Sequence, residues 1–158
     1  MLVSLAFIFS YIEAVIPIPI PVPGVKLGLA NLVTIVGLYT VGVKGTVAVS
    51  LIRIVLVGCT FGNLFSMVYG LAGGALSLLL MILFRRTKWF SQVGISIIGG
   101  IGHNVGQLTV AALVTETAGV FYYLPFLLVA GTVAGAVIGL LGGLVTERIR
   151  KYVGKSMP

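Results

Sequence analysis

The chain alternates between long apolar runs and short polar, glycine-rich or proline-rich breaks. Its first apolar run extends from Met1 to Ile16 and leads into Pro17-Ile18-Pro19-Ile20-Pro21-Val22-Pro23-Gly24. Alternating prolines cannot continue a helix, since each lacks a backbone N–H and its ring clashes with the preceding turn. This pattern predicts a helix over residues 1–16 that ends in a stiff, extended connector.

Four later breaks divide the rest of the chain into five more apolar runs. The breaks are a glycine-containing stretch at residues 41–45, a glycine-bounded turn at 58–62, a basic cluster at 85–88 and a loop at 115–123. We expect helices over residues 26–39, 46–57, 63–84, 89–115, and from 122 to the basic end at 147–151. The second and third helices are short for a hydrocarbon core of about 30 Å, so we expect them to be tilted or buried among their neighbours.

Composition makes a lipid bilayer the expected surroundings of these helices. Hydrophobic residues make up 59% of the chain and charged residues 8%, and the mean hydropathy is +1.21. A soluble domain carries about a quarter charged residues, so this chain has too few polar side chains to cover a water-exposed surface. We therefore predict one domain over residues 1–158, an all-α integral membrane protein folded as a compact bundle of about six transmembrane helices.

The basic residues indicate the orientation of the bundle. The net charge is +7, and in a membrane protein an excess of Lys and Arg marks the cytoplasmic side rather than a nucleic-acid partner. With six helices, Lys44, the cluster at 85–88 and the basic tail at 148–155 all fall on the same side as the N-terminus. We expect both termini to be cytoplasmic in a multi-pass protein of the cell membrane.

Acidic and metal-binding residues are too few for most enzyme chemistry. There is no aspartate, the acids are Glu13, Glu116 and Glu147, and the chain has one His and one Cys. The aspartate-rich magnesium sites of prenyl-chain synthases are therefore missing, and the Gly-Lys-Ser triplet at 154–156 lacks the upstream glycine of a phosphate-binding loop. We expect no catalytic residues, no metal site and no cofactor, so any ATP or diphosphate chemistry belongs to a partner chain.

Small residues recur every four positions on three predicted helices. They are Gly131, Gly135, Gly139 and Gly143; Gly102 and Gly106; and Ala6, Ser10 and Ala14. This spacing lets helix backbones approach closely inside a bilayer, where the hydrophobic effect does not drive helices together. For the two glycine stripes we favour packing within the chain. For the stripe on the first helix two interpretations stay open, packing within the chain and a docking surface for another membrane subunit.

Polar residues within the apolar runs gather at one predicted depth, in the outer half of the bundle. Such residues are costly in hydrocarbon and tend to mark function. The candidate substrate-binding residues are Glu13, Lys26, Asn31, Arg53, Asn63, His103, Asn104, Gln107, Tyr122 and Tyr123. Their shared depth predicts an outward-facing polar pocket for a small molecule.

Charged residues of this set suggest an anionic or polar-headed ligand. Lys26 is expected at a helix N-terminus, where the dipole favours anions, and Arg53 lies within an apolar run. Both would meet a phosphate or carboxylate of the substrate. The alternative is a structural ion pair between Glu13 and Arg53, since an unpaired arginine in a membrane is expensive.

The neutral polar residues suggest directional hydrogen bonding. His103 and Gln107 are four residues apart and share a helical face, with Asn104 beside them. They would bind a small organic molecule, or alternatively hydrogen-bond to neighbouring backbones. Tyr122 and Tyr123 would close over the ligand, or alternatively anchor their helix in the headgroup region.

Motifs along nearly the whole chain resemble those of one bacterial family. They are Tyr11-Ile12-Glu13, Pro21-Val22-Pro23-Gly24-Val25-Lys26-Leu27-Gly28-Leu29-Ala30-Asn31, Ser50-Leu51-Ile52-Arg53, Tyr69-Gly70-Leu71-Ala72-Gly73-Gly74, Gly102-His103-Asn104-Val105-Gly106-Gln107 and Tyr122-Tyr123-Leu124-Pro125. These strings resemble the Gx transporters, a family also called heptaprenyl diphosphate synthase component I. That family is similar to the substrate-capture (S) components of energy-coupling-factor (ECF) transporters.

The resemblance implies an importer subunit in the bacterial plasma membrane. It implies the six-helix S-component fold, an outward pocket for a vitamin-like or cofactor-related molecule, and docking to a transmembrane coupling subunit with ATPase subunits. S components commonly carry small residues at four-residue spacing on the first helix, which Ala6, Ser10 and Ala14 fit.

Two other functions stay open at this stage. One is a non-catalytic membrane accessory subunit of isoprenoid (heptaprenyl diphosphate) synthesis, which would need a lateral opening between helices for the prenyl chain. The other is a scaffold of a larger membrane complex, whose polar residues would satisfy one another and leave no cavity.

Overall fold

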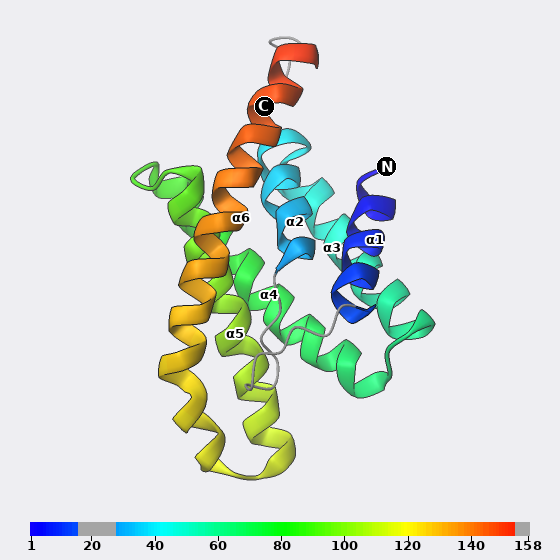
Figure 1. The fold of residues 1–158 in the computed structure, drawn as a ribbon, viewed down its shortest axis with the longest axis vertical. Coiled ribbons are helices and arrows are strands. Elements are labelled where there is room, and N and C mark those ends of the chain that lie inside the picture. Colours follow the sequence, from blue (N-terminus) through cyan, green and yellow to red (C-terminus); the bar gives the residue numbers. More distant parts are fainter. Residues whose placement is uncertain (16–27, 154–158) are drawn as a thin grey trace.

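The protein is a bundle of six α-helices, with no strand among the residues that the structure describes (Figure 1). The computed structural model describes residues 1–15 and 28–153; the predicted proline connector and Lys26 lie outside this part of the chain. The predicted all-α fold is confirmed. The elements are α1 Leu2–Val15, α2 Leu29–Thr40, α3 Gly42–Thr60, α4 Leu64–Thr87, α5 Gln92–Thr115, the 3-10 helix η1 Ala118–Tyr123, and α6 Leu124–Val153.

Four helical segments are long and apolar enough to cross a membrane. They are Gly42–Thr60, Leu64–Thr87, Gln92–Thr115 and Ala118–Tyr152. The remaining helices, α1 and α2, have 14 and 12 residues, which makes them about 21 and 18 Å long. Helix α2 lies inside the bundle, with its residues 33–38 all buried and with contacts to α1, α3, α5 and α6. The expectation that a short second helix is buried among its neighbours is therefore confirmed.

The predicted break at residues 41–45 and the predicted turn at 58–62 are both wrong in their bounds. Only Val41 separates α2 from α3, since Gly42 adopts a φ of 79° and turns the chain in one step. Gly58 does not begin a turn but lies buried inside α3, where a Cβ would stand 1.9 Å from Met67 Cγ. The third helix is accordingly longer than predicted, with 19 residues.

Glycines bring α4, α5 and α6 into backbone contact. A Cβ on Gly135 of α6 would lie 2.6 Å from Ile97 Cα of α5, and a Cβ on Gly106 of α5 would lie 2.6 Å from the Ala72 carbonyl oxygen of α4. Gly143 differs, since no described atom lies within 4 Å of its Cβ position. The prediction that the glycine stripes pack within the chain is confirmed except at Gly143.

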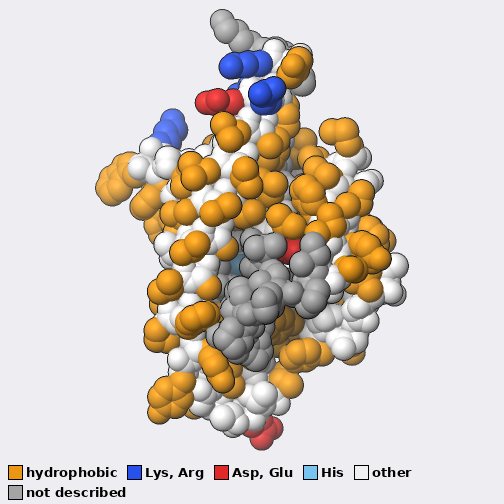
Figure 2. Space-filling model, viewed as in Figure 1, with side chains coloured by type: hydrophobic (Ala, Val, Ile, Leu, Met, Phe, Trp, Pro, Cys, Tyr) orange, Lys and Arg blue, Asp and Glu red, His pale blue; other side chains and the backbone are white. Residues whose placement is uncertain are grey.

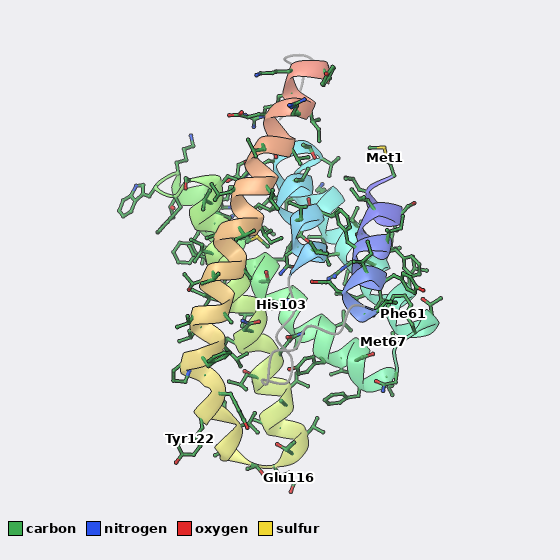
Figure 3. The ribbon with its side chains drawn as sticks, viewed as in Figure 1. Met1, Phe61, Met67, His103, Glu116 and Tyr122 are labelled. Carbon is green, nitrogen blue, oxygen red and sulfur yellow. The ribbon has the colours of Figure 1, made fainter. Side chains whose placement is uncertain are left out.

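Charged residues divide the bundle into two unlike ends. Lys and Arg side chains gather where α6 ends and at the turn between α4 and α5, while hydrophobic side chains cover most of the visible face between the ends (Figure 2). At the basic end, Arg85 joins the end of α4 to the end of α2. It donates a hydrogen bond to the Leu38 carbonyl and stacks over the Tyr39 ring, with 4.8 Å to the ring centroid. Glu116 and Tyr122 lie at the opposite end (Figure 3).

Candidate functional site

A cavity of about 200 Å³ lies among all six helices. It brings together six of the ten candidate substrate-binding residues: Glu13, Asn31, Arg53, His103, Asn104 and Gln107. Ser10, Ser66 and Ser96 add hydroxyl groups to its walls. The cavity collects these six residues from helices far apart in the sequence.

Helix α5 lines the cavity from Ser96 to Gln107, and the other helices contribute the parts that lie away from the basic end. The rest of the lining comes from the last turns of α1, the first turn of α2, the second half of α3 and the first half of α4. Helix α6 likewise contributes from its first half, at Ala130–Ile138. Each of these segments is the part of its helix that is remote from the basic end (Figure 1).

Three of the remaining candidate residues lie outside the cavity lining, and Lys26 lies outside the described residues. Asn63 caps α4: its Oδ1 accepts from the Ser66 N–H at 2.7 Å, and the Ser66 Oγ accepts from the Asn63 N–H at 2.8 Å. Tyr122 is 89% exposed at the far end of the bundle, and Tyr123 is 47% exposed in the same 3-10 helix. In this structure neither tyrosine covers the cavity.

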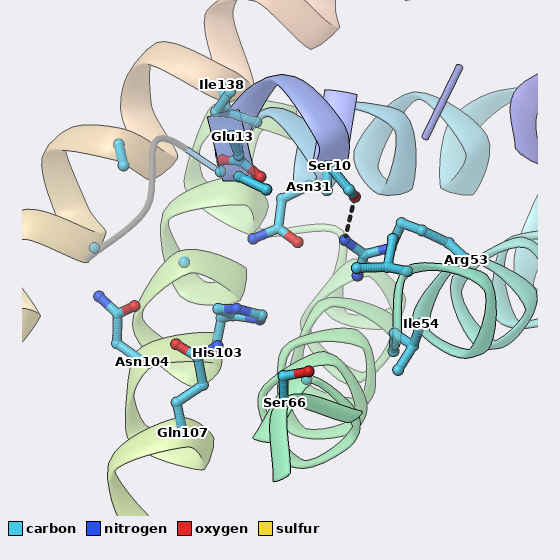
Figure 4. Close-up of a pocket in the computed structure, with 18 of the residues that line it drawn as sticks. Ser10, Glu13, Asn31, Arg53, Ile54, Ser66, His103, Asn104, Gln107 and Ile138 are labelled. Atoms are coloured by element: carbon cyan, nitrogen blue, oxygen red, sulfur yellow. Dashed lines mark hydrogen bonds between the residues drawn. The ribbon is translucent and has the colours of Figure 1, made fainter. Parts of the chain in front are cut away.

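Arg53 of α3 carries the positive charge of the cavity wall. Its Nη1 lies 3.4 Å from the Ser10 Oγ of α1 (Figure 4), a long distance for such a bond. Its Nε is buried and has no hydrogen-bond partner among the described residues. Within residues 1–15 and 28–153 no ion pair within 4.0 Å joins Arg53 to Glu13, so the structural ion pair considered from the sequence is not formed. Glu13 is still close enough for its charge to act on Arg53.

Glu13 instead caps α2 from a different helix. Its Oε1 accepts a hydrogen bond from the Leu29 N–H, with 2.9 Å between nitrogen and oxygen. Gly28, the residue before α2, has a φ of 78° and no side chain with which to cap the helix. The first N–H groups of a helix lack internal partners and carry a partial positive charge. The Glu13 carboxylate, at the edge of the cavity, therefore supplies both a hydrogen-bond acceptor for the N–H group and a negative charge opposite the partial positive charge.

Helix α5 supplies the neutral wall. The Asn104 Nδ2 donates to the Leu127 carbonyl of α6 at 2.8 Å, so this residue bonds a neighbouring backbone while lining the cavity. Gln107 is only 4% exposed, and its amide makes no hydrogen bond within the described part of the chain. Asn31 of α2 also lines the cavity without a side-chain hydrogen bond to any described residue. His103 lies on the same wall of α5 (Figure 4).

The sequence interpretation missed the serines and glycines of the lining. Ser10 belongs to the small-residue stripe of the first helix, and Gly100, Gly131 and Gly135 bring α5 and α6 together while also lining the cavity. They could have been predicted, because these stripes reach the same depth in the bundle as the polar candidate residues. Small residues at that depth leave space for a ligand as well as for a neighbouring helix.

The docking surface predicted on α1 needs correction. Ala6 is 1% exposed and Ser10 is 8% exposed, because both face inward where α1 packs on α2 and α3. Ala14 alone remains exposed, at the edge of the cavity. Packing within the chain is therefore the role of Ala6 and Ser10, and the large hydrophobic side chains that α1 exposes belong to other residues: Leu5, Ile8, Tyr11 and Val15.

The described residues contain no group of three or more His, Cys, Asp or Glu that could hold a metal ion. Cys59 is an exposed free thiol in the last turn of α3 and does not line the cavity. The arrangement can hold a small polar molecule by hydrogen bonds and one positive charge.

Comparison with known proteins identifies a family. The family described as heptaprenyl diphosphate synthase component I matches residues 2–145. No curated protein and no solved structure matches the chain.

Proposed function

The chain belongs to the heptaprenyl diphosphate synthase component I family, and from this premise and the cavity we propose that it is the substrate-binding component of an ECF-type importer. It captures a small vitamin- or cofactor-related molecule, with an anionic or polar head, from outside the cell. A transmembrane coupling subunit and ATPase subunits supply the energy. The chain itself binds and releases the molecule without chemical change.

The observation that carries this proposal is the polar cavity within an apolar bundle. Polar side chains in a membrane protein are costly, and a structural role would pair them with one another. Here the amides of Asn31 and Gln107 and the Nε of Arg53 make no hydrogen bond within the described part of the chain. Unused hydrogen-bonding groups around a cavity are typical of a ligand site, and they argue against a scaffold.

The cavity also supports binding rather than catalysis. Glu13 is the only carboxylate among its described lining residues, and this carboxylate already caps α2. General acid–base chemistry needs a group within hydrogen-bond reach of the substrate proton and free to exchange it. A single carboxylate in the described lining also argues against magnesium-assisted diphosphate chemistry, which relies on clustered carboxylates.

A second candidate is favoured by the family description, which names a synthase component. In that function the chain is a non-catalytic membrane subunit of isoprenoid synthesis and holds a prenyl diphosphate. Arg53 would meet the diphosphate, and the apolar helices would meet the prenyl chain.

Affinity purification of the tagged full chain from native membranes, in mild detergent, separates the two functions. We expect mass spectrometry to identify a transmembrane coupling subunit together with ATPase subunits. Recovery of a prenyl synthase subunit without an ATPase would overturn the importer function in favour of the second candidate. A tagged, unrelated membrane protein of similar abundance serves as the control for nonspecific recovery.

Membrane orientation is a separate prediction, because an importer must expose its cavity outward. In a Cys59→Ser background, single cysteines replace Thr117, at the end bearing Glu116, and Trp89, at the basic end; both positions are exposed. Since Lys and Arg favour the cytoplasmic side, we expect Thr117→Cys to react with a membrane-impermeant maleimide in intact cells. Trp89→Cys should react only after the membrane is opened, and the reverse pattern would contradict the orientation.

A further inference from the structure

We propose that the ligand of this cavity is a small monoanion, of the carboxylate class, that also carries an amide-like hydrogen-bonding edge. This deepens the proposed function and rests on it, since it takes the cavity to be a substrate site. Two observations lead to the two parts of the ligand: the charges of the lining, and the buried amide of Gln107.

The charges of the described lining favour one negative charge on the ligand. Arg53 is the only Arg or Lys among the described lining residues, and Glu13 is the only acid. The Glu13 charge is partly balanced by the positive N-terminal end of α2, through the hydrogen bond to Leu29. Arg53 therefore keeps an excess of positive charge that one anionic group would neutralise. A diphosphate, with several charges, would be repelled by Glu13 and would exceed what one arginine can balance.

The geometry of Arg53 suits a carboxylate. Within the part of the chain that the structure describes, its guanidinium makes one long contact, with Ser10 at 3.4 Å, and its buried Nε has no partner. A guanidinium presents its N–H groups in a planar fork that matches the two oxygens of a carboxylate. A bidentate carboxylate would supply the hydrogen bonds that Arg53 lacks.

Gln107 determines the neutral part of the ligand. Its side chain is 96% removed from solvent, being 4% exposed, and it lines the cavity without a hydrogen bond to any described residue. A buried amide needs partners for both its N–H donors and its carbonyl acceptor. The group that offers both at once is another amide, such as the lactam edge of a pyrimidinone or pyridone ring.

The two parts lie on opposite walls of one small space. Arg53 and Ser10 lie on one side of the cavity and Gln107 and Asn104 on the other, with Asn31 between them (Figure 4). A cavity of about 200 Å³ limits the ligand to a compact molecule. A single heterocyclic ring with a carboxylate substituent has both the size and the two required groups.

Ligand-induced thermal stabilisation of the detergent-purified full chain tests this proposal. The probes are single-ring lactam carboxylates, namely uracil-6-carboxylate and the 2-pyridone-carboxylates. Each is compared with its neutral methyl ester and with an aromatic carboxylate of similar size that lacks the lactam, and inorganic pyrophosphate is the multiply charged probe. We expect at least one lactam carboxylate to stabilise the protein more than both of its matched analogues and more than pyrophosphate.

Variants then connect each part of the ligand to its residue. Arg53→Gln should weaken binding of the best carboxylate by about 10- to 100-fold, as expected for loss of hydrogen bonds to a charged group, and should remove its advantage over the ester. Gln107→Leu should remove the advantage of the lactam over the plain aromatic carboxylate. Arg86→Gln, at the basic end, is the matched control and should bind like the unaltered protein. Arg53→Lys, which keeps the charge without the fork, covers the case in which Arg53→Gln fails to fold.

Three results would overturn the proposal. They are the absence of any lactam carboxylate that binds better than its ester, a best ligand whose binding is unchanged in both Arg53→Gln and Arg53→Lys, and stronger stabilisation by pyrophosphate than by every carboxylate. The first two leave the importer function intact if the coupling and ATPase subunits are recovered with the chain. The third would favour the prenyl diphosphate function instead.

Discussion

Gly135→Ala is expected to lower the free energy of unfolding by about 2 kcal/mol, the range typical of overpacking a well-packed interior. The new Cβ would lie 2.6 Å from Ile97 Cα and 2.8 Å from the Ser96 carbonyl oxygen. Both are backbone atoms of α5, so no side chain can rotate away and the two helices must separate. The measurement is the thermal or denaturant-induced unfolding of the purified protein in one detergent.

Gly143→Ala is the matched control for Gly135→Ala. Both glycines belong to α6 and to the same four-residue stripe, but no described atom lies within 4 Å of the Cβ position of Gly143. Alanine is favoured over glycine inside a helix by roughly 0.5–1 kcal/mol, so stability should be unchanged or slightly raised. Equal destabilisation by the two substitutions would contradict the contact geometry and would indicate that Gly143 packs against something else.

These two glycines also show how far the sequence could predict the packing. The four-residue spacing identified the stripe and the correct interpretation of it, because close helix approach requires small residues at that period. Spacing could not separate Gly143 from Gly135, since the difference depends on where α5 begins relative to α6: Gly139 still faces Val93, and α5 starts at Gln92. The roles of Gly42 and Gly58 also depend on neighbouring residues in the fold. Gly42 turns the chain, whereas Gly58 leaves room for Met67, and the sequence alone does not distinguish these roles.

The sequence could indicate which residues line the cavity, but not which of them form hydrogen bonds with which partners. Depth along each apolar run depends only on distance from the loops, which is why six residues that line one cavity could be grouped from the sequence. The partner of Glu13 depends on where α2 begins, and with Gly28 as its N-cap the helix starts at Leu29, three residues beyond Lys26. The sequence therefore suggested an Arg53 partner for Glu13, whereas its hydrogen-bond partner is the Leu29 N–H.

Glu13 connects the stability of the bundle to the cavity proposed as the ligand site. Its carboxylate ties the end of α1 to the first turn of α2, and that same turn carries Asn31 into the cavity. Because the capped N–H group is only part-buried, loss of the cap leaves it partly hydrated and costs less than a fully buried unpaired group would. The consequence for α2 is fraying of its first turn, with Asn31 losing its position.

Substitution of Glu13 by Ala and by Gln separates the cap from the charge. Glu13→Ala removes both, so we expect a loss of about 1–2 kcal/mol in the free energy of unfolding, typical of a lost helix cap, together with weaker ligand binding. Glu13→Gln keeps an oxygen that can accept from Leu29, so its stability should stay close to that of the unaltered protein. It also removes the negative charge beside Arg53, so an anionic ligand should bind at least as tightly as before. The measurements are detergent unfolding and carboxylate titration of both variants. If Glu13→Gln loses ligand binding while keeping its stability, the carboxylate contacts the ligand directly and its role as a cap is secondary.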